Sequence, residues 1–319
     1  MKHYNIPVFI PHEGCPHACI FCNQKKITGV HTSVTPAMAE AIIKEGLVWL
    51  PEEEKQAEAA FFGGSFTGLP LSLQRQFYQA ARRLKDQISG IRLSTRPDYI
   101  TAPVLELAAE YGVTVIELGA QSADDAVLEK NERRHTFAQT CRAAEQIQQA
   151  GIGLGIQMMT GMYGSDAETD LRSARLFAQL KPVCARIYPV LVLKDTVLEQ
   201  LYRQGKYQPQ TLEAAVETAK DALLEFRSRS IPVIRLGLHA GEDLRQPGTV
   251  AAGPFHPAFG ELVESRIWRD KLEKMVLEQG VREIRVPDRE MSRAVGHKGC
   301  NRRYFQEKYG IVLRFSPEE

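Results

Sequence analysis

The sequence predicts an α/β protein whose main body is a parallel sheet covered by helices, followed by a small α+β module. Apolar runs of strand length alternate with amphipathic helical segments through most of the chain. Its 319 residues, 44% of them hydrophobic, suffice for one large domain and a small one. Near the end the order changes to strand, helix, helix, strand. Pattern alone leaves open whether the sheet is doubly wound or closes into a full or partial barrel.

The strands and helices of the main body can be expected in order. The apolar, strand-forming segments are residues 6–11, 58–62, 91–95, 113–118, 152–159, 183–193 and 233–238. The helical segments are residues 35–50, 71–86, 102–111, 137–150, 166–179, 212–228 and 268–279. Thr35 and Pro36 form an N-cap followed by proline at the first helical position. Gly112 and Gly151 end the helices that they follow.

Three cysteines, Cys15, Cys19 and Cys22, follow the first strand in a C-x3-C-x2-C spacing. Thiolates are soft ligands that suit iron–sulfur clusters and zinc. Three of them are one fewer than a closed zinc site or an ordinary four-iron cluster requires. The spacing therefore predicts a cluster with one iron left open for a small molecule.

Two alternatives compete with this interpretation of the cysteines. A zinc knuckle would need His12 or His17 as its fourth ligand, and neither has a usual spacing. A disulfide framework suits small secreted domains, whereas this chain is long and its first twelve residues have a strand pattern without a signal-peptide run.

With Phe21 before the last cysteine, the loop resembles the signature of the radical S-adenosylmethionine (SAM) superfamily, C-x3-C-x-aromatic-C. The resemblance implies a [4Fe–4S] cluster on Cys15, Cys19 and Cys22, whose open iron chelates the amino and carboxylate groups of SAM. One electron then cleaves SAM to a 5′-deoxyadenosyl radical. A partial (β/α)6 TIM-like barrel is also implied, with the cluster at the carboxyl ends of the strands. Flavodoxin or ferredoxin is the usual electron donor of the family.

A glycine turn follows the second expected strand. Gly63 and Gly64 let the backbone approach a ligand closely, and a simple tight turn is the alternative. The corresponding motif of the superfamily holds the SAM amino group. Ser65 replaces the usual acidic residue here, so only backbone carbonyls and a hydroxyl can take that role.

Polar residues at the next strand ends are further candidates for SAM contacts. Glu117 and Gln121 are placed to hydrogen-bond a ribose or another polar part of the nucleoside. Arg133, favoured over Arg134, would suit the SAM carboxylate, against the alternative of a solvated helix end. Gln157 points towards SAM in this interpretation.

Two further motifs have a structural alternative. Met159 can pack on adenine or lie in the core, as methionines more often do. Arg96 and Asp98 can act in the site or form a structural ion pair and helix cap.

Several motifs between residues 6 and 238 resemble, in order and spacing, the radical-SAM half of the Elongator catalytic subunit family. They are TRPD at 95–98, ELGAQS at 117–122, and the segments 128–136 and 186–196. That family acts on wobble uridines of transfer RNA with acetyl-CoA. Its first two cysteines are further apart, and its acetyltransferase domain needs a long segment after the barrel. We therefore expect no acetyl-CoA chemistry in this chain.

The C-terminal segment has the order strand 281–286, helix 288–295, a G-x-x-G loop, helix 301–309 and strand 311–315. This order resembles the core of a KH domain, whose loop approaches a single-stranded nucleic-acid backbone. Nine basic residues against four acidic ones lie between 281 and 315. The expected RNA contacts are Gly296, His297, Lys298, Gly299, Arg302 and Arg303. The alternative is that both glycines merely end helices.

The expected organisation is a radical SAM barrel at 1–270 and a KH-like module at 271–319. An irregular loop at 251–261 can lie over the barrel mouth, with His239 and His256 as candidate substrate contacts. No run approaches the ~20 apolar residues of a membrane span. Reduced cluster ligands indicate a cytoplasmic protein.

Three functional hypotheses follow. A radical SAM enzyme that modifies RNA (tRNA or rRNA) is favoured. A small-molecule enzyme similar to oxygen-independent coproporphyrinogen oxidase is the second, and a non-enzymatic iron–sulfur RNA-binding sensor is the third. SAM cleavage by the reduced, reconstituted protein and co-purification of RNA separate them.

Changing Cys15, Cys19 or Cys22 to Ala should abolish the visible absorbance of the cluster and SAM cleavage together, because each thiolate binds its own iron. Absorbance spectra, iron content and 5′-deoxyadenosine release measure both. Normal iron content in all three variants would show that the cysteines are not the ligands.

Overall fold

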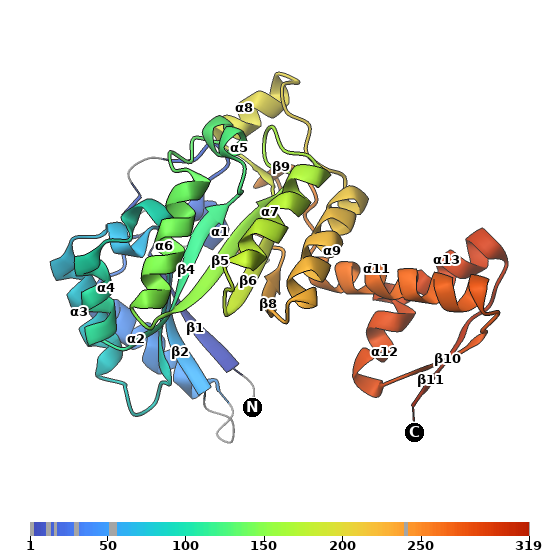
Figure 1. Cartoon of the computed structure of the whole chain (residues 1–319), viewed down its shortest axis with the longest axis horizontal. Helices are drawn as coiled ribbons and strands as arrows, with labels where there is room; N and C mark the ends of the chain where they lie inside the picture. Colours follow the sequence, from blue (N-terminus) through green and yellow to red (C-terminus); the bar gives the residue numbers. More distant parts are fainter. Residues whose placement is uncertain are drawn as a thin grey trace.

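The computed structural model describes residues 3–10, 14–15, 18–28, 32–50, 56–238 and 242–318. Its centre is a sheet of seven strands, all parallel, in the order β1-β2-β3-β4-β5-β6-β8 (Figure 1). The strands are β1 (His3–Ile10), β2 (Gln56–Gly63), β3 (Gly90–Thr95), β4 (Val113–Gln121), β5 (Gly153–Thr160), β6 (Cys184–Pro189) and β8 (Val233–Leu236). The fold class expected from the sequence is confirmed, and the seventh strand, β8, adds to the six that the resemblance implied.

Most helices pack on the outer side of the sheet, and the short ones at residues 125–130 and 197–203 lie beyond its carboxyl edge (Figure 1). These helices are α2 (Pro36–Val48), α3 (Leu71–Arg82), α4 (Ala102–Glu110), α5 (Asp125–Lys130), α6 (Phe137–Gln149), α7 (Ala167–Gln179), α8 (Val197–Arg203) and α9 (Leu212–Ser228). Thr35 caps α2 by accepting from the Met38 amide, as expected from the Thr-Pro pair. Thr136 and Gln139 form a capping box on α6. The parallel order with helical crossovers therefore follows from the alternation in the sequence.

The two faces of the sheet differ in polarity. Along β4, Ile116 and Leu118 are fully buried in the core shared with the helices. Glu117, between them, points to the opposite face, because successive side chains of a strand alternate. Arg186 of β6 lies over the ring of Phe62 of β2, 4.9 Å from its centroid, although these strands are not neighbours. The sheet is therefore curled into a half-barrel whose inner face is polar.

Two elements differ from the sequence-based expectation. The segment 183–193 is not one strand: β6 ends at Pro189, and β7 (Val192–Leu193) pairs antiparallel with β9 (Val250–Ala252). Pro189 ends the ladder because a proline cannot donate a backbone hydrogen bond. The last long helix, α11 (Phe259–Glu273), begins nine residues earlier than the expected 268 and continues into a π-helical turn, Lys274–Glu278. The glycines and prolines before it concealed this start.

The C-terminal module has the expected order of elements. It contains β10 (Glu283–Val286), α12 (Asp288–Val295), a short turn at His297–Gly299, α13 (Cys300–Tyr309) and β11 (Arg314–Pro317). The two strands pair in parallel. The module has its own hydrophobic cluster, in which Leu272 and Phe305 are fully buried, and it stands apart from the sheet at the far end of α11 (Figure 1).

Helix α11 contributes to both cores. Phe259, Val263 and Ile267 pack into the main core, while Trp268 and Leu272 pack into the core of the module. This change of partner supports our proposed division into residues 1–270 and 271–319.

Leu272→Ala should destabilise the module by about 2–5 kcal/mol, the usual effect of a cavity at a fully buried leucine. Limited proteolysis with mass-spectrometric mapping should find new cleavage after residue 280. Val263→Ala, on the same helix but in the main core, is the matched control and should expose main-body sites instead. Identical cleavage patterns would show that the two clusters unfold as one.

Candidate cofactor site at the carboxyl edge of the sheet

A cavity of about 120 Å³ lies where β2, β3, β4 and β5 end. Eight of the residues expected from the sequence line it: Cys15, Cys19, Cys22, Gly63, Gly64, Gln121, Arg133 and Gln157. Phe21 and Arg96 line it as well. The chain therefore brings the cysteine loop and the ends of four strands to one place.

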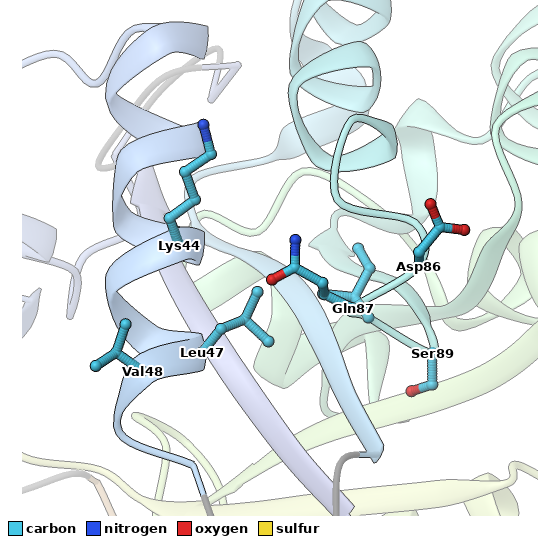
Figure 2. Close-up of a pocket in the computed structure, with 7 residues that line it drawn as sticks. Lys44, Leu47, Val48, Asp86, Gln87 and Ser89 are labelled. Carbon is cyan, nitrogen blue, oxygen red and sulfur yellow. The ribbon is translucent and has the colours of Figure 1, made fainter. Parts of the chain in front are cut away.

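A larger cavity, of about 660 Å³, lies elsewhere (Figure 2). It is lined by Lys44, Leu47 and Val48 of α2 and by the segment 86–89 that leads into β3. This is the amino-terminal edge of the sheet, and no cysteine or glycine is among the residues that line the cavity there. We assign the site to the smaller cavity because its side chains carry the chemistry.

The cysteine loop is held by main-chain contacts to two distant segments. The Ile20 amide donates to the Asn131 carbonyl at 3.4 Å, and the Leu198 amide donates to the Ile20 carbonyl at 2.8 Å. Gly14 has a φ of +71°, and a Cβ there would lie 2.0 Å from the Ser65 carbonyl oxygen. Only glycine therefore allows the loop to meet the β2 turn this closely.

After the last cysteine, the short helix α1 (Gln24–Thr28) ties the loop to the segment that follows β7. The Asn23 side-chain amide donates to the Lys194 carbonyl at 3.3 Å. Lys26 pairs with Asp195 at 2.5 Å. The sequence indicated only a polar turn here.

The surroundings of the thiols raise their pKa values. Burial raises the pKa of Cys22 to about 12, and the neighbouring Cys19 and Cys15 add to the shift. Burial and Cys19 likewise raise the pKa of Cys15, while Arg96 and Arg133 oppose the shift. Metal ligation requires thiolates, so loading the site would release protons.

Arg133 connects the cysteine loop with the polar wall of the cavity. Its Nη1 donates to the Cys19 sulfur at 3.1 Å, and its Nη2 donates to the Gly119 carbonyl. Its Nε is buried without a hydrogen-bond partner, and so is Oε1 of Gln121. A Cβ on Gly119 would lie 3.1 Å from the Gln121 side-chain nitrogen. The wall therefore keeps space and unpartnered polar atoms for a polar ligand beside the thiols.

Within the described ranges, no three His, Cys, Asp or Glu side chains gather as ligands of a single metal ion. A cubane cluster is compatible with this arrangement, since its thiolates bind different irons. Three thiols beside a cavity with unpartnered donor and acceptor atoms fit a cluster with SAM next to it.

Glu117 is not at the cavity wall, contrary to its expected direct contact with a nucleoside. It is 1% exposed, and Arg186 binds it in a bidentate pair at 2.6 and 2.9 Å. Arg92 adds a contact at 3.0 Å and also pairs with Glu58 at 2.8 Å. The sequence analysis did not predict that Arg92 and Arg186 would pair with Glu117. The only signal for this role is that each arginine interrupts an apolar strand.

The pair Glu117 and Gln157 determines which amide atom faces the cavity. Nε2 of Gln157 donates to Oε2 of Glu117 at 2.8 Å. An ionised carboxylate only accepts, so the Gln157 side-chain oxygen must be the atom turned away from it. Gln157 lines the cavity, and we expect it to offer an acceptor there.

Three other expected residues have structural contacts. The Ser65 hydroxyl bonds to Thr95 Oγ1 at 2.8 Å and does not line the cavity. Met159 packs in a hydrophobic cluster with Ile20 of the cysteine loop. Arg96 forms the structural ion pair with Asp98, at 2.9 Å, that was one of the two interpretations.

The candidate RNA contacts divide into two groups. Lys298, Arg302 and Arg303 are exposed, as are all nine basic residues between 281 and 315. His297 is only partly exposed: its Nδ1 lies 2.9 Å from Glu261 Oε2, and its amide donates to Ser265 Oγ at 3.0 Å. The G-x-x-G loop folds back on α11, and Gly296 is buried while Gly299 is partly buried.

The candidate histidines of the loop before α11 also differ in outcome. The rings of His256 and His297 meet edge to face, 5.3 Å apart. His256 therefore contacts the module. His239 lies outside the described residues, as do His12 and His17.

The fold and site define an α/β half-barrel with three cysteines beside a cavity at the carboxyl edge of its sheet. Comparison with known families agrees. The radical SAM superfamily profile matches residues 9–177, and the radical SAM C-terminal domain profile matches residues 182–269. The chain belongs to the radical SAM superfamily and is an enzyme. Family membership implies a [4Fe–4S] cluster and SAM as cofactors.

Similar proteins carry names that refer to transfer RNA or to the Elongator complex. A tRNA uridine(34) acetyltransferase of Methanocaldococcus jannaschii is 25% identical over 66% of this chain and 47% of its own length. Elongator complex protein 3 of Saccharomyces cerevisiae is 25% identical over 65% of this chain and 45% of its own length. The chain thus spans about half the length of these relatives.

Solved structures share the fold. Elp3 of Methanocaldococcus infernus, with an N-terminal deletion, is 20% identical with a TM-score of 0.66, covering 90% of this chain and 69% of its own. Coproporphyrinogen III oxidase of Escherichia coli is 15% identical with a TM-score of 0.51, covering 72% and 53%. No helix in the described part of the chain has the length and apolar character needed to cross a bilayer.

Gln157→Leu should weaken SAM binding roughly tenfold, the effect of losing one hydrogen bond of about 1.4 kcal/mol. Glu117 keeps both arginine partners in this variant, so the fold should survive. Equilibrium SAM binding to the cluster-loaded protein measures the effect. Met159→Leu, a matched change on the same strand, should bind SAM normally. Equal affinity in both variants would mean that Gln157 serves only to satisfy Glu117.

Proposed function

We propose that this radical SAM enzyme holds a [4Fe–4S] cluster on Cys15, Cys19 and Cys22, cleaves SAM reductively, and modifies an RNA, either tRNA or rRNA. The observation that carries the proposal is the single cavity shared by the three cysteines, the glycine turn, Arg133 and Gln157. When bound, the cluster would supply one electron to SAM, which breaks into methionine and a 5′-deoxyadenosyl radical.

The residues of the cavity divide the recognition of SAM among them. The unpartnered Nε of Arg133 suits the SAM carboxylate. Backbone carbonyls at Gly63 and Gly64 would accept from the amino group, since the Ser65 hydroxyl is engaged by Thr95. The Gln121 and Gln157 side-chain oxygens would accept from the nucleoside.

RNA as the substrate is supported by two independent observations. The matching relatives are named for tRNA uridine 34 or for the Elongator complex. Residues 281–315 of the C-terminal module carry nine exposed basic side chains and four acidic ones, and phosphate backbones bind to such basic surfaces. The side chains of Lys298, Arg302 and Arg303 would contact phosphates. The backbone of the G-x-x-G loop would not, because the loop is held against α11. A cytoplasmic location and reduction by a flavodoxin or ferredoxin belong to the same proposal.

A small-molecule substrate is the second candidate, because the half-barrel also resembles coproporphyrinogen III oxidase in fold. The decisive experiment supplies reduced, cluster-loaded protein and SAM with tRNA, rRNA fragments or a porphyrinogen. Nucleoside and product mass spectrometry then identify which one is changed. A modified nucleoside supports the proposal, and modification of the porphyrinogen alone replaces it.

The triple variant Lys298→Glu, Arg302→Glu, Arg303→Glu should reduce RNA affinity by tenfold or more, because carboxylates would replace three exposed cations at the phosphate-binding surface. Filter binding across a salt series measures affinity and slope. Lys85→Glu with Arg142→Glu, two exposed cations on the main body, is the charge-reversal control and should bind RNA as the wild type does. Equal losses in both variants would make the effect one of overall charge.

A further inference from the structure

The inner face of β6 and β8 is not used by the candidate cofactor site. Residues from β2, β3, β4 and β5 line the cavity, and none comes from β6 or β8. Gln157 lines the cavity and pairs in register with Arg186 of β6, which pairs with Arg235 of β8. Residues in register share a face of the sheet. Arg186 and Arg235 therefore continue the cavity wall across the last two strands.

The lower part of this inner face is filled. Arg186 is bound to Glu117 through two nitrogens and covers the ring of Phe62. Arg186, Glu117 and Phe62 thus fill the space between β2 and β6, and we call this layer the floor of the half-barrel. Tyr188, two residues further towards the carboxyl edge, lies on the same side of β6. Tyr188 and Arg235 are both partly exposed, so the space above the floor is open to a ligand.

Positive charge at this place is not balanced. Arg92 and Arg186 have Glu58 and Glu117 as partners. No carboxylate among the described residues forms an ion pair with Arg235. Burial and Glu117 raise the pKa of Tyr188, while Arg186 and Arg235 lower it. Tyr188 stands two residues from Arg186, the register partner of Arg235, on the same face of the sheet. An unpaired guanidinium beside a phenol suits an oxyanion.

The distance to the cofactor cavity suits a substrate. Two strand spacings of about 4.8 Å separate the backbones of Gln157 and Arg235, roughly 10 Å in all. A nucleotide spans a comparable length between its base and its phosphate. A base presented to the SAM cavity would thus place its own phosphate beside β8.

We propose that Arg235 and Tyr188 form the substrate subsite of the half-barrel and bind an anionic group, which for an RNA substrate is the phosphate of the nucleotide that enters. This proposal rests on the function proposed above and adds a specificity site to it. Enzymes that act on a base take it out of its stack, so one phosphate must enter with it. Arg235 would hold that phosphate and Tyr188 would donate its hydroxyl hydrogen to it.

Arginine footprinting tests the subsite directly. Cluster-loaded protein with SAM is treated with phenylglyoxal, with and without total RNA (tRNA and rRNA) from cells that lack the gene, and modified arginines are quantified by peptide mass spectrometry. Bound RNA should slow modification of Arg235 about tenfold. Arg229, paired with Glu225 at the end of α9, is the internal control and should react equally in both samples.

Variants give the second measurement. Arg235→Gln should raise the Kd for RNA about tenfold, Arg235→Lys should raise it less, and Tyr188→Phe should raise it a fewfold. Iron content reports that each variant has folded and loaded its cluster. Arg229→Gln is the matched substitution and should leave the Kd unchanged.

The outcomes separate the two proposals. In one outcome, RNA shields Arg302 and Arg303 but does not shield Arg235, and it binds the Arg235→Gln variant as tightly as the wild type. This outcome overturns the subsite and leaves RNA as the substrate. RNA that shields none of the three overturns the RNA proposal. Pyrophosphate and citrate then serve as probes: shielding of Arg235 by either supports an anion subsite for a small substrate, and no shielding overturns it.

Discussion

The buried carboxylate of Glu117 is the contact on which the interior of the half-barrel depends. Burial raises the pKa of this carboxyl group, but Arg186, Gln157 and Arg92 outweigh burial and hold the pKa below its usual value. An ionised group so deeply buried is stable only with every lone pair engaged. Removing the carboxylate would leave Arg186 buried with no carboxylate partner in the described chain, which is more costly than losing the pair as a whole.

This requirement orders the surroundings of the site. Arg186 must stay on Glu117, so it stays over Phe62 and holds β6 against β2 across the barrel. Gln157 must present its amide nitrogen to the same carboxylate, so its oxygen is left for the cavity. The curvature of the sheet and the polarity of the cofactor wall thus have a common electrostatic cause. The helices outside contribute apolar packing and place no charge in this network.

Much of the molecule could be predicted from sequence because its signals are local. Cysteine spacing, a glycine turn and strand–helix alternation involve residues close in the chain, and together with polar residues at strand ends they located eight of the residues that line the cofactor cavity. The π-helical turn and the early start of α11 were not predicted, since packing of Phe259 and Val263 outweighs the nearby glycines and prolines. Side-chain partners across strands, such as Arg186 on Glu117, depend on register and carried no readable signal.

The same limit explains the G-x-x-G loop. Its glycines were visible, but its partners Glu261 and Ser265 lie more than thirty residues earlier. Those contacts hold the loop against a helix that belongs to both cores, and His256 closes it from the barrel side. The module is therefore attached to the main body in two ways: through the continuous helix α11, and through the contacts of His297 with Glu261 and His256. Side chains on α13 are consequently carried at a set orientation to α11, and through α11 to the sheet that bears the cofactor cavity.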